Sequence, residues 1–444
     1  MRGMIGYVGL SHLGIVSSVA AAAKGFRVVA FDTDEDLCQS LGKGELPVYE
    51  PGLAELLAEH RARLEFTSER ARLRDCAVVI FSLDVPTDEQ NRSHLQALDE
   101  LFESVVPVLP PQAVLVVLSQ VFPGYMRRLR DRLCSAPEVL PNPLYYQVET
   151  LIFGNAVERA LRPERLIVGC AEPGAPLPTP YAEFLTSFGC PVLPMIYESA
   201  ELAKLAINLY LVATVTTTNT LAELCEGVGA DWSEIQPALR LDKRIGPHAY
   251  LAPGLGIAGG NLERDLTTLK RLAGEAGTEA GIIDAFVRNS TYRRDWALRM
   301  IHKTLPAGVA NPVIALWGLA YKPQTRSTKN SPALALIGQL SVGATGCAIR
   351  AYDPEAAFLA PPDRLVMCPS AMDACRGADV LAVMTPWAEF ARVNLDDMKR
   401  AMRGSVIIDP FGSIPAGQSH AAGFRHFRLG ANELTADQRK EKVA

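Results

Sequence analysis

Short apolar runs alternate with segments of helical periodicity over the first third of the chain. These runs are apolar at almost every position, which is typical of parallel strands that helices bury on both faces. Two later runs predict strands that close this region near residue 195. The alternation predicts a doubly wound α/β domain. The five runs are GFRVVAFD, CAVVIFSL, AVLVVLS, RLIVGC and CPVLP.

The pattern changes after residue 195 and later returns. Apolar spacing from Ser199 to Val228 follows a helical period and predicts one long helix. From Pro312 strands recur in PVIALWGLA, CAIRAYDP, ADVLAVMTPW and SVIIDPFG. The fold class is therefore α/β, with two Rossmann-like doubly wound domains joined by a long central helix and a helical region. We predict domain boundaries at 1–195, 196–305 and 311–444.

Charge and cysteine usage limit the partners and the compartment. The net charge is −5 and no basic block occurs, which argues against a nucleic-acid partner. Nine cysteines occur without CxxC pairs, which argues against disulfides and structural zinc and favours a reducing cytoplasm. No metal site is predicted. The uncharged stretch from Leu205 to Ala222 contains Asn208 and Asn219, so a buried helix is expected and no membrane span.

The chain opens with MIGYVGLSHLG, a glycine-rich segment between a strand and a helix. Glycines at such a turn let a pyrophosphate approach backbone N–H groups. We assign Gly6 and Gly9 to the second and third glycines of a dinucleotide fingerprint, with Met4 at the first, so either the first turn is altered or the chain start is misassigned. Asp32 follows Gly9 by 23 residues and favours NAD over NADP. The expected cofactor contacts in this part of the chain are Gly6, Tyr7, Val8, Gly9 and Asp32.

Several further segments resemble the UDP-glucose/GDP-mannose dehydrogenase family, and in this order they span nearly the whole chain. The resemblance implies NAD binding in the first domain, a dimer seam and a substrate loop in the helical domain, and nucleotide-sugar binding in the last. It also implies a cytoplasmic homodimer that binds a UDP- or GDP-linked sugar, as in polysaccharide biosynthesis. The segments are GYVGL, GKGELPVYEPGLAELL, LDVPTDEQN, LRPERLIVG, LDKRIGPHAYLAPG, WGLAYKP, AYDPEA and VMTPWAEF.

The family oxidises a sugar C6 alcohol to a carboxylate in two hydride transfers, through a thioester on a cysteine. In the matching segment, GLGIAGGNLERD, Asn261 stands at the cysteine position and Arg264 replaces a lysine, while Asp265 matches. Lys204 and Asn208 match the oxyanion-stabilising lysine and asparagine. Their i,i+4 spacing places both on one helix face. The resemblance implies a catalytic set of Lys204, Asn208, Asp265, Glu149 and the altered position Asn261.

Other positions that the family resemblance covers are either retained or altered in this sequence. Ser119 remains in the loop expected to contact the cofactor, whereas Gln120 replaces the threonine beside it. The resemblance implies that the substrate contacts are Arg244, Tyr250, Leu251, Gly254, Gly259, Gly260 and Lys322. The altered positions near the cofactor and the water-handling residues are Val85, Ile152, Phe153, Arg326, Ser327 and Phe411.

Three functions remain open at this stage. The first is an NAD-dependent oxidoreductase that interconverts an alcohol and a carbonyl of a nucleotide sugar in one two-electron step, because Asn261 cannot form a thioester. The second is a non-catalytic paralogue that binds a nucleotide sugar or a partner protein. The third is a full 6-dehydrogenase that forms a uronic acid without a cysteine.

Overall fold

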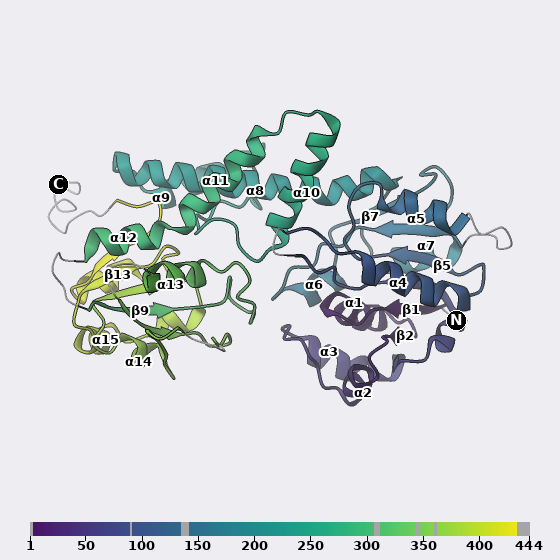
Figure 1. Cartoon of the computed structure of the whole chain (residues 1–444), viewed down its shortest axis with the longest axis horizontal. Coiled ribbons are helices and arrows are strands. Elements are labelled where there is room, and N and C mark those ends of the chain that lie inside the picture. Colours follow the sequence, from purple (N-terminus) through teal and green to yellow (C-terminus); the bar gives the residue numbers. More distant parts are fainter. Residues whose placement is uncertain are drawn as a thin grey trace. The chain divides into compact units, whose positions relative to one another are not determined.

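The computed structural model describes residues 3–88, 91–134, 142–305, 311–342, 347–358 and 362–432. The chain divides into two compact units, Met1–Ile207 and Asn208–Ala444. The division falls within the long helix α8 (Tyr197–Val228), which is shown in teal in Figure 1. The boundaries predicted at residues 195, 305 and 311 stay predictions.

The first unit contains an eight-stranded sheet in the order β3-β2-β1-β4-β5-β6-β7-β8. Neighbouring strands are parallel except β6 and β7, which are antiparallel. The sequence predicted β2, β4, β5, β7 and β8, but it missed β3 and β6. The strands are β1 (Met4–Val8), β2 (Val28–Phe31), β3 (Leu64–Thr67), β4 (Cys76–Phe81), β5 (Val114–Val117), β6 (Leu144–Gln147), β7 (Leu166–Cys170) and β8 (Val192–Ile196). The helices before α8 are α1 (His12–Ala23), α2 (Glu35–Lys43), α3 (Leu53–His60), α4 (Gln96–Val105), α5 (Tyr125–Cys134), α6 (Ala156–Leu161) and α7 (Thr179–Thr186).

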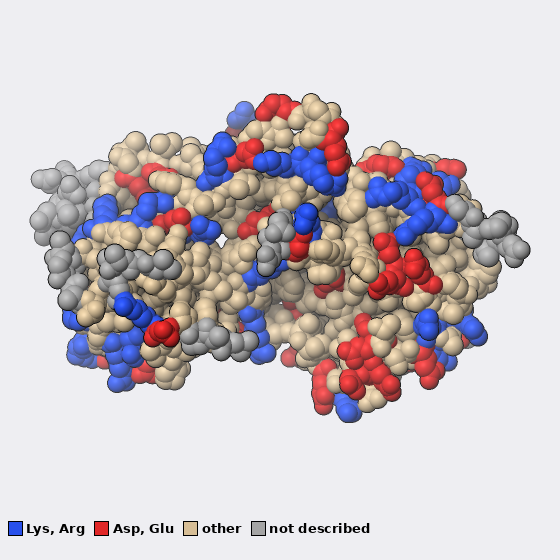
Figure 2. Space-filling view, in the orientation of Figure 1, with Lys and Arg blue, Asp and Glu red and all other residues tan. Residues whose placement is uncertain are grey.

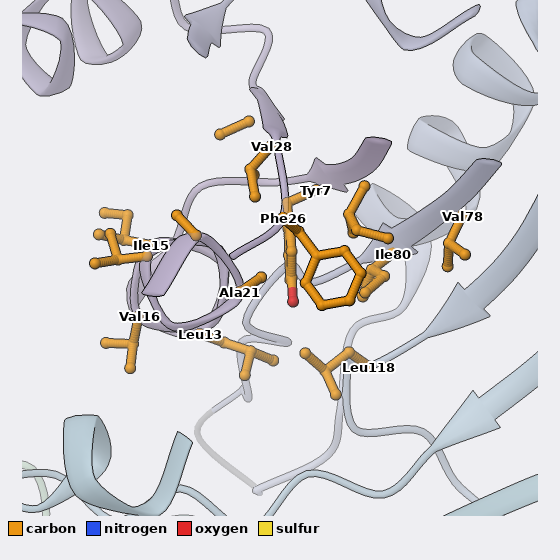
Figure 3. Close-up of a cluster of buried hydrophobic side chains, with 14 of the residues drawn as sticks. Tyr7, Leu13, Ile15, Val16, Ala21, Phe26, Val28, Val78, Ile80 and Leu118 are labelled. Atoms are coloured by element: carbon orange, nitrogen blue, oxygen red, sulfur yellow. The ribbon is translucent and has the colours of Figure 1, made fainter. Parts of the chain in front are cut away.

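Helices cover both faces of this sheet because its central strands are apolar on both. Along β4, Val78 and Ile80 enter the cluster under α1, while Val79 and Phe81 enter the cluster on the opposite face. Figure 3 shows the α1 side, where Leu13 and Ala21 of the helix lie near Tyr7 and Ile80 of the strands. Continuous apolar runs were therefore a correct signal for doubly covered strands.

The second unit contains a six-stranded, wholly parallel sheet in the order β11-β10-β9-β12-β13-β14. This is the 3-2-1-4-5-6 order of a doubly wound nucleotide-binding domain. The sequence predicted such a domain and its strands β9, β10, β12 and β13, but it missed β11 and β14. Its strands are β9 (Val313–Trp317), β10 (Ala348–Tyr352), β11 (Leu365–Met367), β12 (Val380–Val383), β13 (Val406–Ile408) and β14 (Arg425–Phe427). The helices after α8 are α9 (Trp232–Leu241), α10 (Asn261–Ala276), α11 (Gly281–Arg294), α12 (Trp296–Thr304), α13 (Pro332–Val342), α14 (Ala371–Cys375), α15 (Leu395–Ala401) and α16 (Ala416–Ala421).

The long helix α8 confirms the helix predicted from Ser199 to Val228, but the expectation that it is buried was wrong. Its length and apolar composition would suffice to cross a membrane, and 28% of its most apolar stretch is buried in the single chain. The helix nevertheless gives Glu201, Asn208 and Asn219 polar partners inside the protein. Such contacts are those of a helix packed within a folded domain.

An ion pair with a buried arginine fastens the end of α8 to the helices that follow. The guanidinium of Arg293 on α11 is fully buried, and its Nη1 lies 2.6 Å from Glu223 Oε2 on α8. One turn on, Glu226 accepts hydrogen bonds from the backbone of Gly430 at 2.9 Å and from the indole of Trp296. These contacts join α8, α11, α12 and the strand β14 region into one packed layer of the second unit.

At its other end, α8 holds a loop of the first sheet through Glu201. The fully buried carboxylate accepts from the backbone N–H groups of Gly124 at 2.7 Å and Met126 at 2.8 Å. These donors belong to the first turn of α5, whose N–H groups have no partner within the helix. Burial raises the pKa of Glu201 to about 7, and the two backbone donors oppose that rise. The contact fixes the start of α5, which follows the loop carrying Ser119 and Gln120.

Glu201 predicts a specific pH dependence of stability. Its pKa is raised from 4.5 to about 7, so the folded state binds the proton more tightly than the unfolded chain between these values. Stability from this group is therefore full below about pH 4.5 and is lost as the pH rises through 7, by about 2–3 kcal/mol. Relative to Glu201→Gln, the wild type should lose that amount between pH 5 and pH 8 in urea titrations. An unchanged difference between the two proteins at both pH values would contradict this assignment.

Candidate functional site

The glycine-rich turn lies later in the chain than the sequence suggested. Strand β1 continues through Gly6, Tyr7 and Val8, and the side chains of Tyr7 and Val8 are buried in the two cores. The turn itself begins at Gly9 and leads into α1 at His12. The fingerprint G-x-G-x-x-G therefore corresponds to residues 9–14. The segment GYVGL resembles the family's motif in sequence, but its first three residues lie in β1 and not in the glycine-rich turn. This corrects the assignment of Gly6, Tyr7 and Val8 as cofactor contacts and leaves Gly9 in the turn.

The corrected register explains the short first strand, because Met4 begins β1 and no glycine is required there. Gly9 has a φ of +89°, and a Cβ on it would lie 3.1 Å from the backbone N of Leu83. A Cβ on Gly14 would lie 1.9 Å from the carbonyl oxygen of Gly9. These are the first and third glycines of the fingerprint, which shape the turn and bring helix and strand together. The second position is Ser11, whose hydroxyl donates to Ser82 O at 3.2 Å.

Asp32 occupies the predicted place after β2, beside this turn. Its Oδ2 accepts from Leu10 N at 2.6 Å and its Oδ1 from Asp34 N at 3.0 Å. Each oxygen retains a further lone pair for a ribose hydroxyl. Figure 2 shows acidic side chains gathered over α2 and α3, which follow Asp32 in the chain and include Glu35 and Asp36. That negative surface disfavours a 2′-phosphate, as predicted for NAD over NADP.

Two other expected cofactor-side residues have structural contacts at the carboxyl edge of the sheet. Ser119 is fully buried after β5, and its backbone N–H donates to Phe81 O at 3.1 Å. Val85, which replaces a threonine of the family, is 9% exposed and packs in the second core of the first unit. A threonine hydroxyl at this buried position would need a hydrogen-bond partner, and valine does not.

Glu149 and Lys204 form the first part of the candidate catalytic site, within the first unit. Burial is the largest influence on Glu149 and raises its pKa, whereas the positive charge of Lys204 lowers it. The carboxylate also accepts from the backbone N–H of Leu151. The negative charge of Asp84 acts in the opposite direction and raises the pKa of Glu149. These effects together define a carboxyl group whose proton affinity depends on two neighbouring charges.

Asn208 and Asp265 form the second part, within the second unit. The amide of Asn208 on α8 donates to Oδ2 of Asp265 on α10, while Oδ1 of Asp265 accepts from Arg264 Nε at 3.1 Å. All three side chains are buried. Asn261, at the position of the family's cysteine, is exposed at the first residue of α10. Asn208 is thus held by Asp265, and Lys204 acts on Glu149.

The predicted substrate loop packs against α8 and the second Rossmann-like fold. Asn219 accepts from Gly254 N at 2.8 Å, and Thr218 donates to Tyr250 O at 3.0 Å. Tyr250 is 45% exposed, whereas Leu251 is buried and its carbonyl accepts from the indole of Trp232. The Tyr250 ring can therefore face a ligand, and the Leu251 side chain serves packing.

Glycines 259 and 260 bring this loop close to the segment after β9. Both have positive φ values, 93° and 90°. A Cβ on Gly259 would lie 2.6 Å from the ring of Tyr321, and one on Gly260 would lie 2.8 Å from Cε of Lys329. Lys322 extends near that same ring, with Nζ 5.6 Å from its centre.

One altered position, Phe411, and one retained position, Arg244, complete the candidate site of the second unit. Phe411, where the family has arginine, lies with Cε1 3.9 Å from the place of a Cβ on Gly254. It therefore borders the predicted substrate loop with an apolar ring. Arg244 lies in the exposed loop after α9, where its guanidinium binds both oxygens of Asp242. Its predicted contact with substrate across a dimer stays a prediction.

The sequence missed a buried acidic residue in each unit. Glu50 lies in the family-like segment PVYEPGL and accepts from Gly154 N at 3.0 Å, Ala156 N at 2.7 Å and His12 Nε2 at 3.0 Å. The ring of His12 also lies 4.3 Å from that of Phe153, which replaces a glutamate of the family. The available signal was the position of Glu50 in this family-like segment, between Tyr49 and a proline.

In the second unit, Asp353 holds the turn after β9. Its Oδ2 accepts from Leu319 N at 2.6 Å and Ala320 N at 3.0 Å. The motif AYDP placed this aspartate directly after a strand, as Asp32 follows its own strand in RVVAFD. That correspondence was the available signal.

Three family models match the chain in order. The NAD binding domain of the UDP-glucose/GDP-mannose dehydrogenase family matches residues 3–178, its central domain matches 198–291 and its UDP binding domain matches 315–415. NAD is the cofactor that this NAD binding domain indicates. Among the described residues, no group of three or more His, Cys, Asp or Glu could hold a metal ion.

Characterised relatives and solved structures agree with these matches. The chain is 30% identical to a UDP-glucose 6-dehydrogenase of Pseudomonas aeruginosa over 90% of this chain and 92% of that protein. It is 28% identical to the UDP-glucose 6-dehydrogenase TuaD of Bacillus subtilis over 99% and 95%. The fold is that of a UDP-glucose dehydrogenase from Pyrobaculum islandicum, with a TM-score of 0.83 and 24% identity over 97% of this chain and 98% of that one. The chain belongs to the UDP-glucose/GDP-mannose dehydrogenase family and is an NAD-dependent nucleotide-sugar dehydrogenase by that membership.

Proposed function

We propose that this protein oxidises a CH–OH group of a nucleotide sugar by one two-electron step, to an aldehyde or ketone, or catalyses the reverse reduction. The proposal depends on one observation, which is that Asn261, the first residue of α10, stands in place of the nucleophilic cysteine. An amide cannot form the thioester on which the second oxidation depends. Cys225, the cysteine nearest to it in sequence, is buried, and burial raises the pKa of its thiol. A substitute thiolate is therefore disfavoured.

The retained residues suffice for a single step. NAD, which the glycine-rich turn and Asp32 would hold, would supply the acceptor for the hydride that leaves the carbinol carbon. Glu149 takes the hydroxyl proton, because burial raises its pKa above that of an ordinary carboxylate and improves it as a base. Lys204 places a positive charge beside it and stabilises the oxygen as negative charge develops.

Asp265 has a different role in this proposal. Its two oxygens bind Arg264 and Asn208, and it is 2% exposed. These contacts engage both oxygens of the carboxylate, so Asp265 orients the Asn208 side chain.

The proposed substrate is a UDP- or GDP-linked sugar, bound in the cytoplasm. The relatives named above act on UDP-glucose, and the third family model is a UDP binding domain. The exposed Tyr250 ring and the loop through Gly260 support a nucleotide-sugar site in the second unit. Phe411 in place of arginine supports altered recognition of the ligand, because a charged donor is replaced by an apolar ring.

A second function, binding of a nucleotide sugar without redox chemistry, is favoured by Ser11. This serine stands at the second glycine position, where the backbone must approach the pyrophosphate. A third function, full oxidation to a uronic acid without a cysteine, would need Asn261 to position water for attack on the aldehyde.

The single-step proposal predicts the stoichiometry of turnover. With NAD and a panel of UDP-, GDP- and TDP-sugars, the reactive sugar should yield one NADH per sugar consumed, and a hydrazide should trap a carbonyl product. Absorbance of NADH and mass spectrometry of the nucleotide sugar measure both. Two NADH per sugar with uronate formation would establish the third function. Sugar binding without NAD binding would establish the second.

The role of Glu149 predicts a shift in the pH profile. Lys204 lowers the pKa of Glu149, so Lys204→Met should raise it and move the acidic limb of kcat/KM to higher pH. Loss of the stabilising charge should also lower kcat by about 10²-fold or more. Lys204→Arg keeps the charge and is the matched control, whose acidic limb should stay near that of the wild type. An unmoved limb in Lys204→Met would remove Glu149 from the role of base.

A homodimer through α8 is part of the proposal. Exposed apolar side chains recur along one face of this helix at spacings of three, four and seven residues, which is the pattern of a helix–helix seam. Tyr210 is 78% exposed, Leu224 57% and Val228 76%, in a single chain. Leu221 lies between them on the same stripe. Removal of these side chains from water provides the driving force for pairing.

The dimer predicts the effect of one charge on this stripe. Leu224→Glu should convert the protein to monomers in sedimentation-velocity runs at micromolar concentration, because it buries an unpaired carboxylate in the seam. Ile282→Glu places the same change on α11, at a side chain 58% exposed, and should leave the assembly unchanged. A dimer that persists in Leu224→Glu would place the interface elsewhere.

A further inference from the structure

The loop after β4 lies across the beginning of α1. The carboxylate of Asp84 accepts from the backbone N–H of Leu13, the second residue of the helix, at 3.3 Å. In return, the hydroxyl of Ser11 accepts from the backbone N–H of Asp84 at 2.8 Å. The same hydroxyl donates to Ser82 O at 3.2 Å. Hydrogen bonds between side chains and backbone therefore run in both directions between the glycine-rich turn and this loop.

These contacts use the groups that a dinucleotide requires. The N–H groups at a helix N-terminus bind the pyrophosphate, and the helix dipole favours a negative charge there. Asp84 supplies a negative charge from within the chain, and Leu10 N already donates to Asp32. Two anions cannot share the N–H of Leu13 without repulsion. The carboxylate must therefore leave this donor when a pyrophosphate binds.

Ser11 adds a second, independent observation at the same place. It occupies the second position of the fingerprint, where glycine leaves room for close approach of the pyrophosphate. Its side chain is held against the loop by bonds to Ser82 and Asp84. Ser11 therefore keeps the Asp84 backbone beside the helix, and the two residues act as a unit.

We infer that Asp84, positioned by Ser11, is an affinity determinant of the dinucleotide site that competes with the pyrophosphate for the start of α1. The inference rests on the proposed use of NAD and adds a residue that weakens its binding. Charged groups that these contacts place around the turn include Asp32, the His12–Glu50 pair, and Glu149 with its neighbour Lys204. Asp84 is exposed, so its carboxylate has solvent into which to move.

The test is equilibrium binding of NADH, ADP and adenosine to the full-length protein. Asp84→Asn keeps an oxygen for Leu13 N–H and removes the charge. It should tighten NADH and ADP by about three- to thirtyfold, the range of charge effects at helix termini. Adenosine, which lacks phosphates, should bind the wild type and the variant equally. Asp75→Asn removes one exposed charge at the other end of β4 and should change each affinity by less than about twofold.

Ser11→Gly provides a second variant that restores the usual glycine and releases the backbone of Asp84. It should also tighten NADH, and in low salt more than in high salt. Equal or weaker NADH binding in both variants would overturn the inference. Tighter adenosine binding to the same extent as ADP would also overturn it, because the effect would not depend on the phosphates. Since no turnover is measured, a failed single-step oxidation leaves this result independent.

Discussion

Both sheets depend on one steric constraint, the lack of a side chain at the glycine that ends the first strand. A Cβ on Gly9 would meet the backbone that follows the neighbouring strand, and one on Gly318 would lie 2.4 Å from Cβ of Thr385. The chain can therefore turn sharply into the space above the sheet. In each unit an aspartate after the second strand then binds the N–H groups of that turn, Asp32 in the first and Asp353 in the second. The cofactor edge and its counterpart in the second unit follow from this pair of contacts.

The two aspartates differ in what they leave for a ligand. Asp32 accepts from two backbone donors, whereas Asp353 accepts from four backbone N–H groups and from the indole of Trp387. A carboxylate has about four lone-pair sites. Asp353 is therefore saturated by its own protein, and a nucleotide on the second sheet has to be recognised by other groups. The same architecture thus serves a dinucleotide in one unit and a nucleotide sugar in the other.

The sequence was informative wherever local pattern and tertiary structure agree. Continuous apolar runs predicted nine strands, because burial on both faces leaves no polar alternation, and apolar spacing at a helical period predicted the long helix. The register predicted for the glycine-rich turn was wrong, because MIGYV looks like part of a turn motif. In the structure its side chains pack into two cores. Asn261, Asp265 and Lys204 could be placed by the resemblance of their segments to those of the family. The contact of Asp265 with Asn208, and that of Asp84 with the start of α1, could not, because these contacts join segments whose approach only the fold determines.

Glu50 has a consequence for how the site is held together. Its bonds to Gly154 and Ala156 span 104 and 106 residues of sequence, and they hold the segment that follows Glu149. Closing so long a loop costs entropy before any contact repays it. The segment behind the proposed base is therefore fixed only where Glu50 and α6 meet. Its order depends on a distant part of the first unit and not on its own neighbours in the sequence.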